Sequence, residues 1–136
     1  MTTTGMPPAH TVLIVDDEVQ LRRVLERTVQ RWGYRAVVCG SAEGAYDLIA
    51  AERPDAVLLD VRLPTMSGLS LYLAVVARWP EMTGRVAVMS GDADEDVVTW
   101  ASRNGCALLR KPFDLAEVEA WLSWILRRRG RQAGQA

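Results

Sequence analysis

The chain has 136 residues, of which 49% are hydrophobic and 24% are charged, and its formal net charge is −1. These values are typical of one soluble globular domain that is large enough for a real hydrophobic core. The near-neutral charge argues against nucleic acid and anionic membranes as partners, and no apolar run is long enough to span a bilayer. Because the amino terminus also lacks a signal-peptide pattern, we expect a cytoplasmic protein.

The cysteines and the single histidine argue against several kinds of site. Cys39 and Cys106 are too few for a disulfide framework and lack metal-ligand spacing, so we interpret them as reduced packing residues. His10 lies in segment 1–10, whose threonines, glycine and prolines indicate a disordered N-terminal tail. An active site centred on histidine is therefore not expected.

The first half of the chain predicts two strands alternating with two helices. Its first strand is β-branched and apolar, and it ends in Asp16, Asp17 and Glu18. Apolar residues then recur at helical spacing as far as Gly33, a natural helix stop, and Ser41 can cap the next helix. The expected elements are a strand at 11–15, a helix at 19–32, a strand at 34–39 and a helix at 42–51.

The second half continues this alternation. Residues 56–60 are four apolar residues followed by Asp60, which suits a strand that is buried on both faces. Pro80 stops the next helix and Asp114 can cap the last one, after which residues 130–136 are expected to fray as a C-terminal tail. The expected elements are a strand at 56–60, a helix at 69–79, a strand at 85–90, a helix at 92–103, a strand at 106–109 and a helix at 115–129.

Five strands that alternate with five helices through short connections define the fold class. This order predicts an α/β fold, with a parallel sheet, helices on both of its faces and right-handed crossovers. Neither an internal repeat nor a domain-scale linker is present, so residues 11–129 are expected to form a single domain.

Four of the predicted strands carry reactive side chains at the same end: Asp16 and Asp17, Asp60, Ser90, and Lys111. A doubly wound sheet gathers the carboxyl ends of its central strands into one crevice. Three carboxylates there would raise one another's pKa unless a cation entered, and their hard oxygen atoms suit Mg²⁺. Together with the charge of Lys111 and the hydroxyl of Ser90, they predict in-line phosphoryl transfer onto an aspartate.

The same residues carry a family resemblance. The motifs Asp16-Asp17-Glu18, Asp60 followed by Leu63-Pro64, Ser90-Gly91 and Lys111-Pro112-Phe113 resemble the response-regulator receiver domains of two-component signalling. They occur in the family's order, and the resemblance covers roughly residues 11–128. It implies a flavodoxin-like, doubly wound sheet with the strand order 2-1-3-4-5.

The resemblance also implies a role for each site residue. Asp60 would accept a phosphoryl group from the phosphohistidine of a sensor histidine kinase or a phosphotransfer protein. Asp17, Asp60 and the backbone carbonyl of Arg62 would ligate Mg²⁺ directly, and Asp16 would do so through water. Lys111 would pair with Asp60 and then with a phosphate oxygen, and Ser90 would bind another phosphate oxygen. In this family a cis peptide commonly precedes the proline that follows the lysine.

The chain departs from the family pattern in three places. Leu108 stands where the family usually has an aromatic residue that turns inward on activation. The segment Gly105–Lys111 is about one residue shorter than usual and resembles the receivers of hybrid histidine kinases. Arg62 and Asp92 lie two residues after Asp60 and Ser90, and we hypothesise that they pair and shield the acyl phosphate. Neutralising both would then speed dephosphorylation.

The last helix presents two further features. Its arginines, Arg127 to Arg129 and Arg131, are expected at a helix C-terminus because cations interact favourably with the helix dipole there. Trp124 falls opposite the core stripe and Trp121 falls on its flank. With Trp100 on the preceding helix, they favour a protein-contact face and allow a homodimer through the last two helices.

We therefore predict a stand-alone phosphoacceptor switch that binds a downstream protein or relays its phosphate, and that does not bind DNA. One alternative is a receiver-fold interaction module that works without phosphorylation, which Leu108 keeps open. Another is an aspartate-nucleophile phosphohydrolase. Such enzymes of the haloacid dehalogenase type carry a second acid at the position of Arg62, so this alternative is disfavoured.

Overall fold

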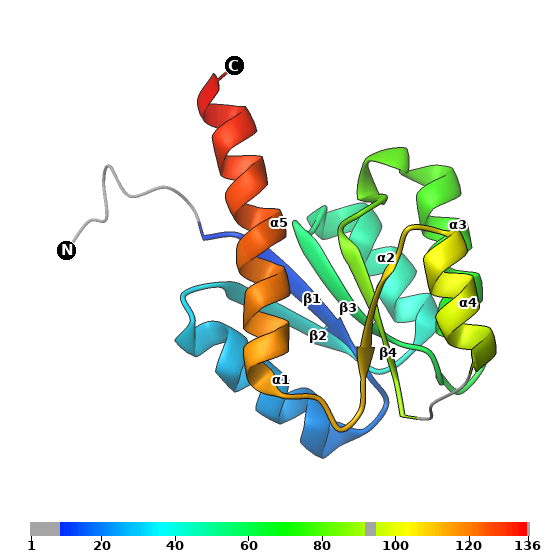
Figure 1. Ribbon diagram of the computed structural model, residues 1–136. Coiled ribbons are helices and arrows are strands. Elements are labelled where there is room, and N and C mark those ends of the chain that lie inside the picture. Colours follow the sequence, from blue (N-terminus) through cyan, green and yellow to red (C-terminus); the bar gives the residue numbers. More distant parts are fainter. Residues whose placement is uncertain (1–8, 92–94, 136) are drawn as a thin grey trace.

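The computed structural model describes residues 9–91 and 95–135 (Figure 1). Its helices and strands alternate along the whole described chain, with one short 3-10 turn, η1, after the third helix. In order they are β1 Thr11–Val15, α1 Val19–Arg31, β2 Arg35–Cys39, α2 Ala42–Glu52, β3 Ala56–Asp60, α3 Gly68–Arg78, η1 Pro80–Met82, β4 Val86–Ser90, α4 Glu95–Arg103, β5 Ala107–Arg110 and α5 Leu115–Gln135.

The five strands form one parallel sheet in the order β2-β1-β3-β4-β5, which confirms the predicted topology. The register aligns the strand ends: Val15 lies beside Leu59, Asp60 beside Met89, and Ser90 beside Arg110. Each strand is extended and runs in the same direction, so the residues that end or follow the strands share one edge of the sheet.

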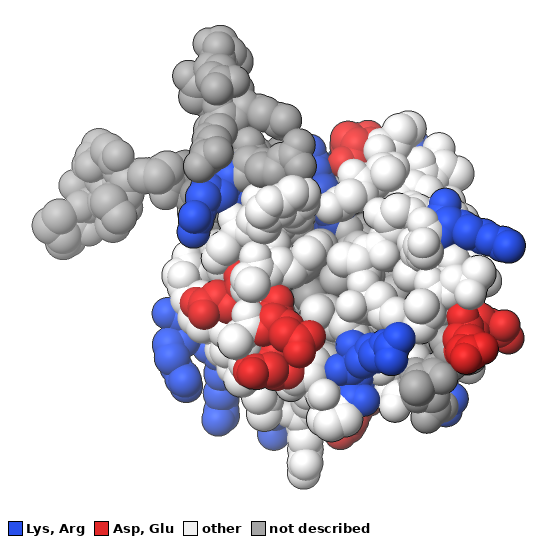
Figure 2. All heavy atoms as spheres, viewed as in Figure 1, with Lys and Arg blue, Asp and Glu red and all other residues white. Residues whose placement is uncertain are grey.

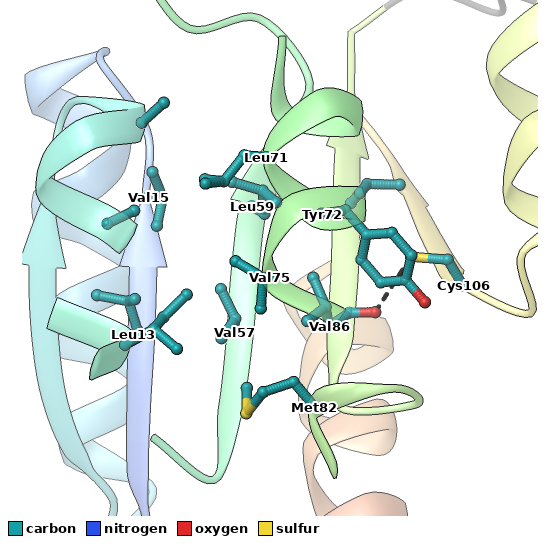
Figure 3. Packing of buried hydrophobic residues seen from close by; sticks show 14 of the residues in the cluster. Leu13, Val15, Val57, Leu59, Leu71, Tyr72, Val75, Met82, Val86 and Cys106 are labelled. Atoms are coloured by element: carbon teal, nitrogen blue, oxygen red, sulfur yellow. Dashed lines mark hydrogen bonds between the residues drawn. The ribbon is translucent and has the colours of Figure 1, made fainter. Parts of the chain in front are cut away.

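Two hydrophobic layers cover the two faces of this sheet, because successive side chains of a strand point to opposite faces. Leu13, Val57 and Leu59 pack on one face against buried residues of α2 and α3. Figure 3 shows Leu71 and Val75 of α3 directed toward these strands, and Tyr72 of the same helix directed toward Cys106. On the other face, α1 and α5 cover Val12, Ile14, Leu58 and Met89 (Figure 1). The fold is therefore doubly wound, as predicted.

Several element boundaries differ from the sequence predictions by one residue or more. Strand β5 begins and ends one residue later than expected: its pairing with β4 starts at Ala107, and Arg110 at its end pairs with Ser90. Helix α3 begins at Gly68, where the Ser67 hydroxyl accepts a hydrogen bond from the Leu69 N–H. Helix α5 continues to Gln135, past the fraying expected from residue 130. Gly130 and Gly134 lie inside this helix without ending it, because a glycine ends a helix only where its backbone turns left-handed.

The two cysteines are free thiols, as the sequence indicated. Cys106 is buried, its Sγ lies 3.3 Å from the Val86 carbonyl oxygen (Figure 3), and burial raises its pKa to about 12. In the described part of the chain, no helix has both the length and the apolar content needed to cross a membrane. Most of the N-terminal tail expected at residues 1–10 lies outside the described residues.

The loop between β3 and α3 folds back onto its own start. The Gly68 N–H donates to the Val61 carbonyl oxygen at 2.8 Å. A Cβ atom built on Gly68 would lie only 2.1 Å from the Asp60 carbonyl oxygen. This oxygen belongs to the backbone, so it cannot rotate away as the end of a flexible side chain could. Glycine is therefore required for this close approach, which fixes how the chain leaves Asp60.

We expect Gly68→Ala to lower the free energy of unfolding by about 1–3 kcal/mol, because the added methyl group must displace the Asp60 carbonyl. Urea denaturation would measure the loss. Gly91→Ala is the matched control: its Cβ would meet no atom of the described residues within 4 Å, so its unfolding midpoint should stay close to that of the wild type. Equal stability of the wild type and Gly68→Ala would contradict the steric argument.

Candidate functional site

Four strands deliver polar side chains to the carboxyl edge of the sheet. Asp16 follows β1 directly, Asp60 ends β3, Ser90 ends β4, and Lys111 follows β5. The structure thus brings together the residues that the sequence singled out. One carboxylate oxygen from each of Asp16, Asp17 and Asp60 lies within 4.8 Å of the others.

Lys111 is the cation in this acidic cluster. Its Nζ donates to the Asp16 carboxylate at 2.9 Å and to the Asp60 carboxylate at 3.3 Å. The sequence led us to expect the contact with Asp60, whereas the shorter contact is the one with Asp16. The Lys111–Pro112 peptide bond is cis, as the resemblance implied, and the Lys111 N–H donates to the Ser90 carbonyl oxygen at 2.7 Å.

Asp60 is 6% exposed and has a donor on each carboxylate oxygen. Oδ1 accepts the Arg62 N–H at 3.1 Å, and Oδ2 faces Lys111. Burial raises the pKa of Asp60, the charge of Asp16 raises it further, and the Arg62 and Lys111 donors only partly offset these effects. Burial also opposes the charge of Lys111, but its hydrogen bond to Asp16 and the charges of both carboxylates raise its pKa overall.

Asp16 has no exposed surface, and two neighbours fix its position. Its Oδ1 accepts the Glu18 N–H at 2.9 Å, and its backbone carbonyl accepts the Arg22 guanidinium at 2.8 Å. Gly40 leaves room for that guanidinium, because a Cβ there would lie 2.6 Å from Arg22 Nη1. Sequence reasoning missed Arg22. The available signal was its place one turn after Glu18, on the helix that follows the acidic pair.

The three carboxylates leave excess negative charge at this edge even with Lys111 protonated. Asp17 is exposed while Asp16 and Asp60 are buried, so the group forms a cup of oxygen atoms that is open to solvent on one side. Hard oxygen donors with room for water are the ligands that Mg²⁺ prefers. The residues present therefore fit a divalent cation. The role of the Arg62 carbonyl as a ligand stays a prediction.

Two departures from the family pattern can be located only in part. Leu108 is half-buried on β5 and packs at the border of the hydrophobic layer formed with α2 and α3. Arg62 is exposed, but Asp92 lies outside the described residues. The proposed pairing of Arg62 with Asp92 therefore remains a hypothesis.

Three grooves are formed by residues that the structure describes, and the first two have mainly apolar linings. The first, of about 470 Å³, adjoins the site between α1 and the β5–α5 loop and is lined by Leu21, Val24, Lys111 and Phe113 among others. The second, of about 320 Å³, lies between α2 and α3. The third, of about 680 Å³, lies near the start of β5 and includes Trp121 and Trp124. Figure 2 shows charged side chains of both signs dispersed over the face it presents, without one dominant patch.

The tryptophans of the last two helices lie mostly as the sequence indicated. Val118, Leu122 and Ile125 of α5 are buried, whereas 59% of Trp124 is exposed. Trp100, which the sequence groups with this surface, instead packs edge-on against Tyr72, with ring centroids 5.3 Å apart. The exposed aromatic face therefore belongs mainly to α5.

The raised pKa of Asp60 predicts how stability depends on pH. The folded state binds this proton more tightly than the unfolded state does, so the carboxyl contributes less stability as pH rises from 3.8 through the raised value. Asp60→Asn removes this titration and leaves Lys111 paired with Asp16. Without divalent cations, we expect the variant to be more stable than the wild type at neutral pH.

Urea unfolding in EDTA, from about pH 4 to pH 8, would measure this difference. The advantage of Asp60→Asn should shrink as the pH falls toward 3.8. Asp47→Asn, at an exposed carboxylate on α2, controls for the loss of one negative charge and should show no such trend. An Asp60→Asn variant less stable than the wild type at neutral pH would contradict the prediction.

Comparison with known proteins identifies the family. The sequence model of the response regulator receiver domain matches residues 12–123. The chain is 33% identical to the transcriptional activator protein PfeR of Pseudomonas aeruginosa, over 89% of this chain and 39% of PfeR. It is 37% identical to the DNA-binding transcriptional regulator NtrC of Proteus hauseri, over 80% of this chain and 23% of NtrC. The chain thus spans less than half the length of these relatives.

Solved structures give the same result. A response regulator receiver protein from Pseudomonas putida aligns with a TM-score of 0.78 and 26% identity, over 87% of this chain and 98% of that structure. The matched residues contain all of the acidic cluster, Ser90 and Lys111. The resemblance found in the sequence is confirmed, and the chain belongs to the response regulator receiver domain family of two-component systems.

Proposed function

We propose that the chain is a cytoplasmic phosphoacceptor switch. It takes a phosphoryl group from the phosphohistidine of a sensor histidine kinase or a phosphotransfer protein onto Asp60, in a reaction that depends on Mg²⁺. The observation that carries this proposal is the position of Asp60 between the Arg62 N–H and Lys111, beside Asp16 and Asp17. The chain would catalyse its own phosphorylation and slow dephosphorylation without acting as an enzyme on small substrates.

The transfer forms one bond and breaks another. A carboxylate oxygen of Asp60 attacks phosphorus, the bond from phosphorus to the imidazole nitrogen breaks, and the released imidazole keeps the electron pair and takes up a proton. Asp17, Asp60 and the Arg62 carbonyl, with Asp16 through water, would hold Mg²⁺, and the bound ion would supply positive charge to neutralise the phosphoryl oxygens. Lys111 is close enough to Asp60 to stabilise that charge from the side of β5.

Ser90 completes the proposed site. It is 6% exposed and ends β4, the strand next to β3 in the sheet. We assign its hydroxyl to a phosphate oxygen of phosphorylated Asp60, toward which it would move on activation. Leu108 lies beside Val88 in the sheet register. Its aliphatic side chain would have to change rotamer in place of the usual aromatic swing.

The groove beside Lys111 supports docking of a protein phosphate donor. Its apolar lining includes Leu21, Phe113 and Val24, which is 50% exposed. A helix that carried a phosphohistidine could bury apolar residues here while it presented the phosphate to the adjoining Asp60. Apolar contact next to a charged reactive group is the arrangement expected of a specific transient interface.

Output would pass through a downstream protein or onward phosphate relay. The groove with Trp121 and exposed Trp124 supports a protein contact on α5, including a homodimer through this surface. Leu108 favours a second candidate, a receiver-fold module that binds its partner without phosphorylation. An aspartate-nucleophile phosphohydrolase is less favoured, since the exposed Arg62 occupies the place of its second acid.

Acetyl phosphate with Mg²⁺ tests the proposal, with intact mass as the readout. We expect the wild type to gain the mass of one phosphoryl group, Asp60→Asn to gain none, and EDTA to prevent the gain. Asp17→Asn should slow labelling at least about tenfold at subsaturating Mg²⁺, because a proposed metal ligand is lost. The matched control is Asp47→Asn, whose carboxylate is exposed on α2 and should not be needed.

Other outcomes would favour the alternatives. A folded wild type that gains no mass under any Mg²⁺ concentration would contradict the switch and favour the phosphorylation-independent module. Release of many equivalents of phosphate per chain would instead favour the hydrolase. Equal labelling of Asp60→Asn and wild type would show that another residue accepts the phosphoryl group.

A further inference from the structure

The groove between α2 and α3 is separate from the phosphoacceptor cluster. Ala42, Tyr46, Leu71 and Ala74 supply most of its apolar lining, and Met66 from the β3–α3 loop forms part of its wall. Met66 is 41% exposed although it is one of the more flexible apolar side chains. The volume of about 320 Å³ suits one large apolar side chain more than a whole small-molecule ligand.

The charges around this groove are of one sign. Glu43 and Asp47 stand one helical turn apart on α2 and both line it. The groove beside Lys111 combines that cation with Glu18, and the tryptophan groove combines Arg85 with Glu81. Of the three grooves described above, this is the one lined by two carboxylates and no cation. Its electrostatic complement is a cationic partner.

A hydrogen bond joins α2 to the β3–α3 loop beside the groove. The Thr65 hydroxyl donates to the Glu43 carboxylate, and this bond lowers the pKa of Glu43. Because Met66 follows Thr65, this bond also ties the loop that carries Met66 to α2. The apolar wall and the acidic rim are therefore held together before any partner arrives, which reduces the ordering cost of binding.

We propose that the α2–α3 groove is a docking surface for an amphipathic helix of a partner protein, one that inserts an apolar side chain flanked by lysine or arginine. The apolar side chain would enter between Tyr46, Leu71 and Met66, and the cations would lie over Glu43 and Asp47. This contact is independent of phosphoryl transfer to Asp60. It would give the chain a third protein-binding site, in addition to the groove beside Lys111 and the Trp124 surface of α5.

An NMR titration of the isotope-labelled full chain would test the proposal. The probes are two helical peptides with the same leucines, one with arginine and the other with glutamate at the flanking positions. We expect the arginine peptide to shift the resonances of Ala42, Met66 and Ala74 saturably, and the glutamate peptide to bind at least about tenfold more weakly. Glu43→Gln combined with Asp47→Asn should weaken the arginine peptide about two- to thirtyfold, as for two exposed ion pairs.

A pair of bulky substitutions on α3 separates the groove from general charge effects. Ala74→Arg places a cation inside the groove and should abolish saturable binding, whereas Ala77→Arg adds the same charge to an exposed position that does not line it. Each variant's own spectrum shows whether it is folded, and acetyl phosphate labelling of Ala74→Arg should match the wild type. Largest shifts at Val24 or Trp124, equal binding of both peptides, or full binding to Ala74→Arg would overturn the proposal.

Discussion

The crowding of three carboxylates around one ammonium group is the constraint on which the rest of the structure depends. Asp16 directly follows β1 and Asp60 ends the neighbouring strand β3, and both are almost fully buried and contact Lys111. Buried charges of like sign stay this close only where a rigid backbone fixes their positions. The parallel sheet supplies that rigidity, since each of these residues directly ends or follows a strand packed on both faces. The packing of the hydrophobic layers beneath the site thus holds these charged side chains close together.

The fold could be predicted because its signals are local and repeated. The apolar run before Asp60 and the helical spacing after Asp17 each indicate one element, and their alternation indicates a doubly wound parallel sheet. The strand order itself follows from the family resemblance. The gathering of Asp16, Asp60, Ser90 and Lys111 follows from that topology, since parallel strands share an edge. These inferences required no knowledge of side-chain contacts, which explains why they agree with the structure.

Contacts that depend on backbone closeness could not be predicted in the same way. The contact of Arg22 with the Asp16 carbonyl requires the missing Cβ of Gly40, eighteen residues away in sequence. The distance from Lys111 Nζ to Asp16 is shorter than its distance to Asp60 by only tenths of an ångström, a difference that the sequence does not predict. The length of α5 depends on whether a glycine turns left-handed, and no residue pattern states this in advance. Each case is decided by three-dimensional packing.

The burial of Cys106 has a consequence for how the chain can be observed in solution. Alkylating reagents attack the thiolate, and a thiol whose pKa is raised to about 12 is almost entirely protonated at neutral pH. Cys106 directly precedes β5, an edge strand of the sheet, and it is 8% exposed at the groove near the start of that strand. The rate at which Cys106 is alkylated, compared with that of the same thiol in the unfolded chain, would therefore measure how strongly the folded structure protects this edge of the sheet.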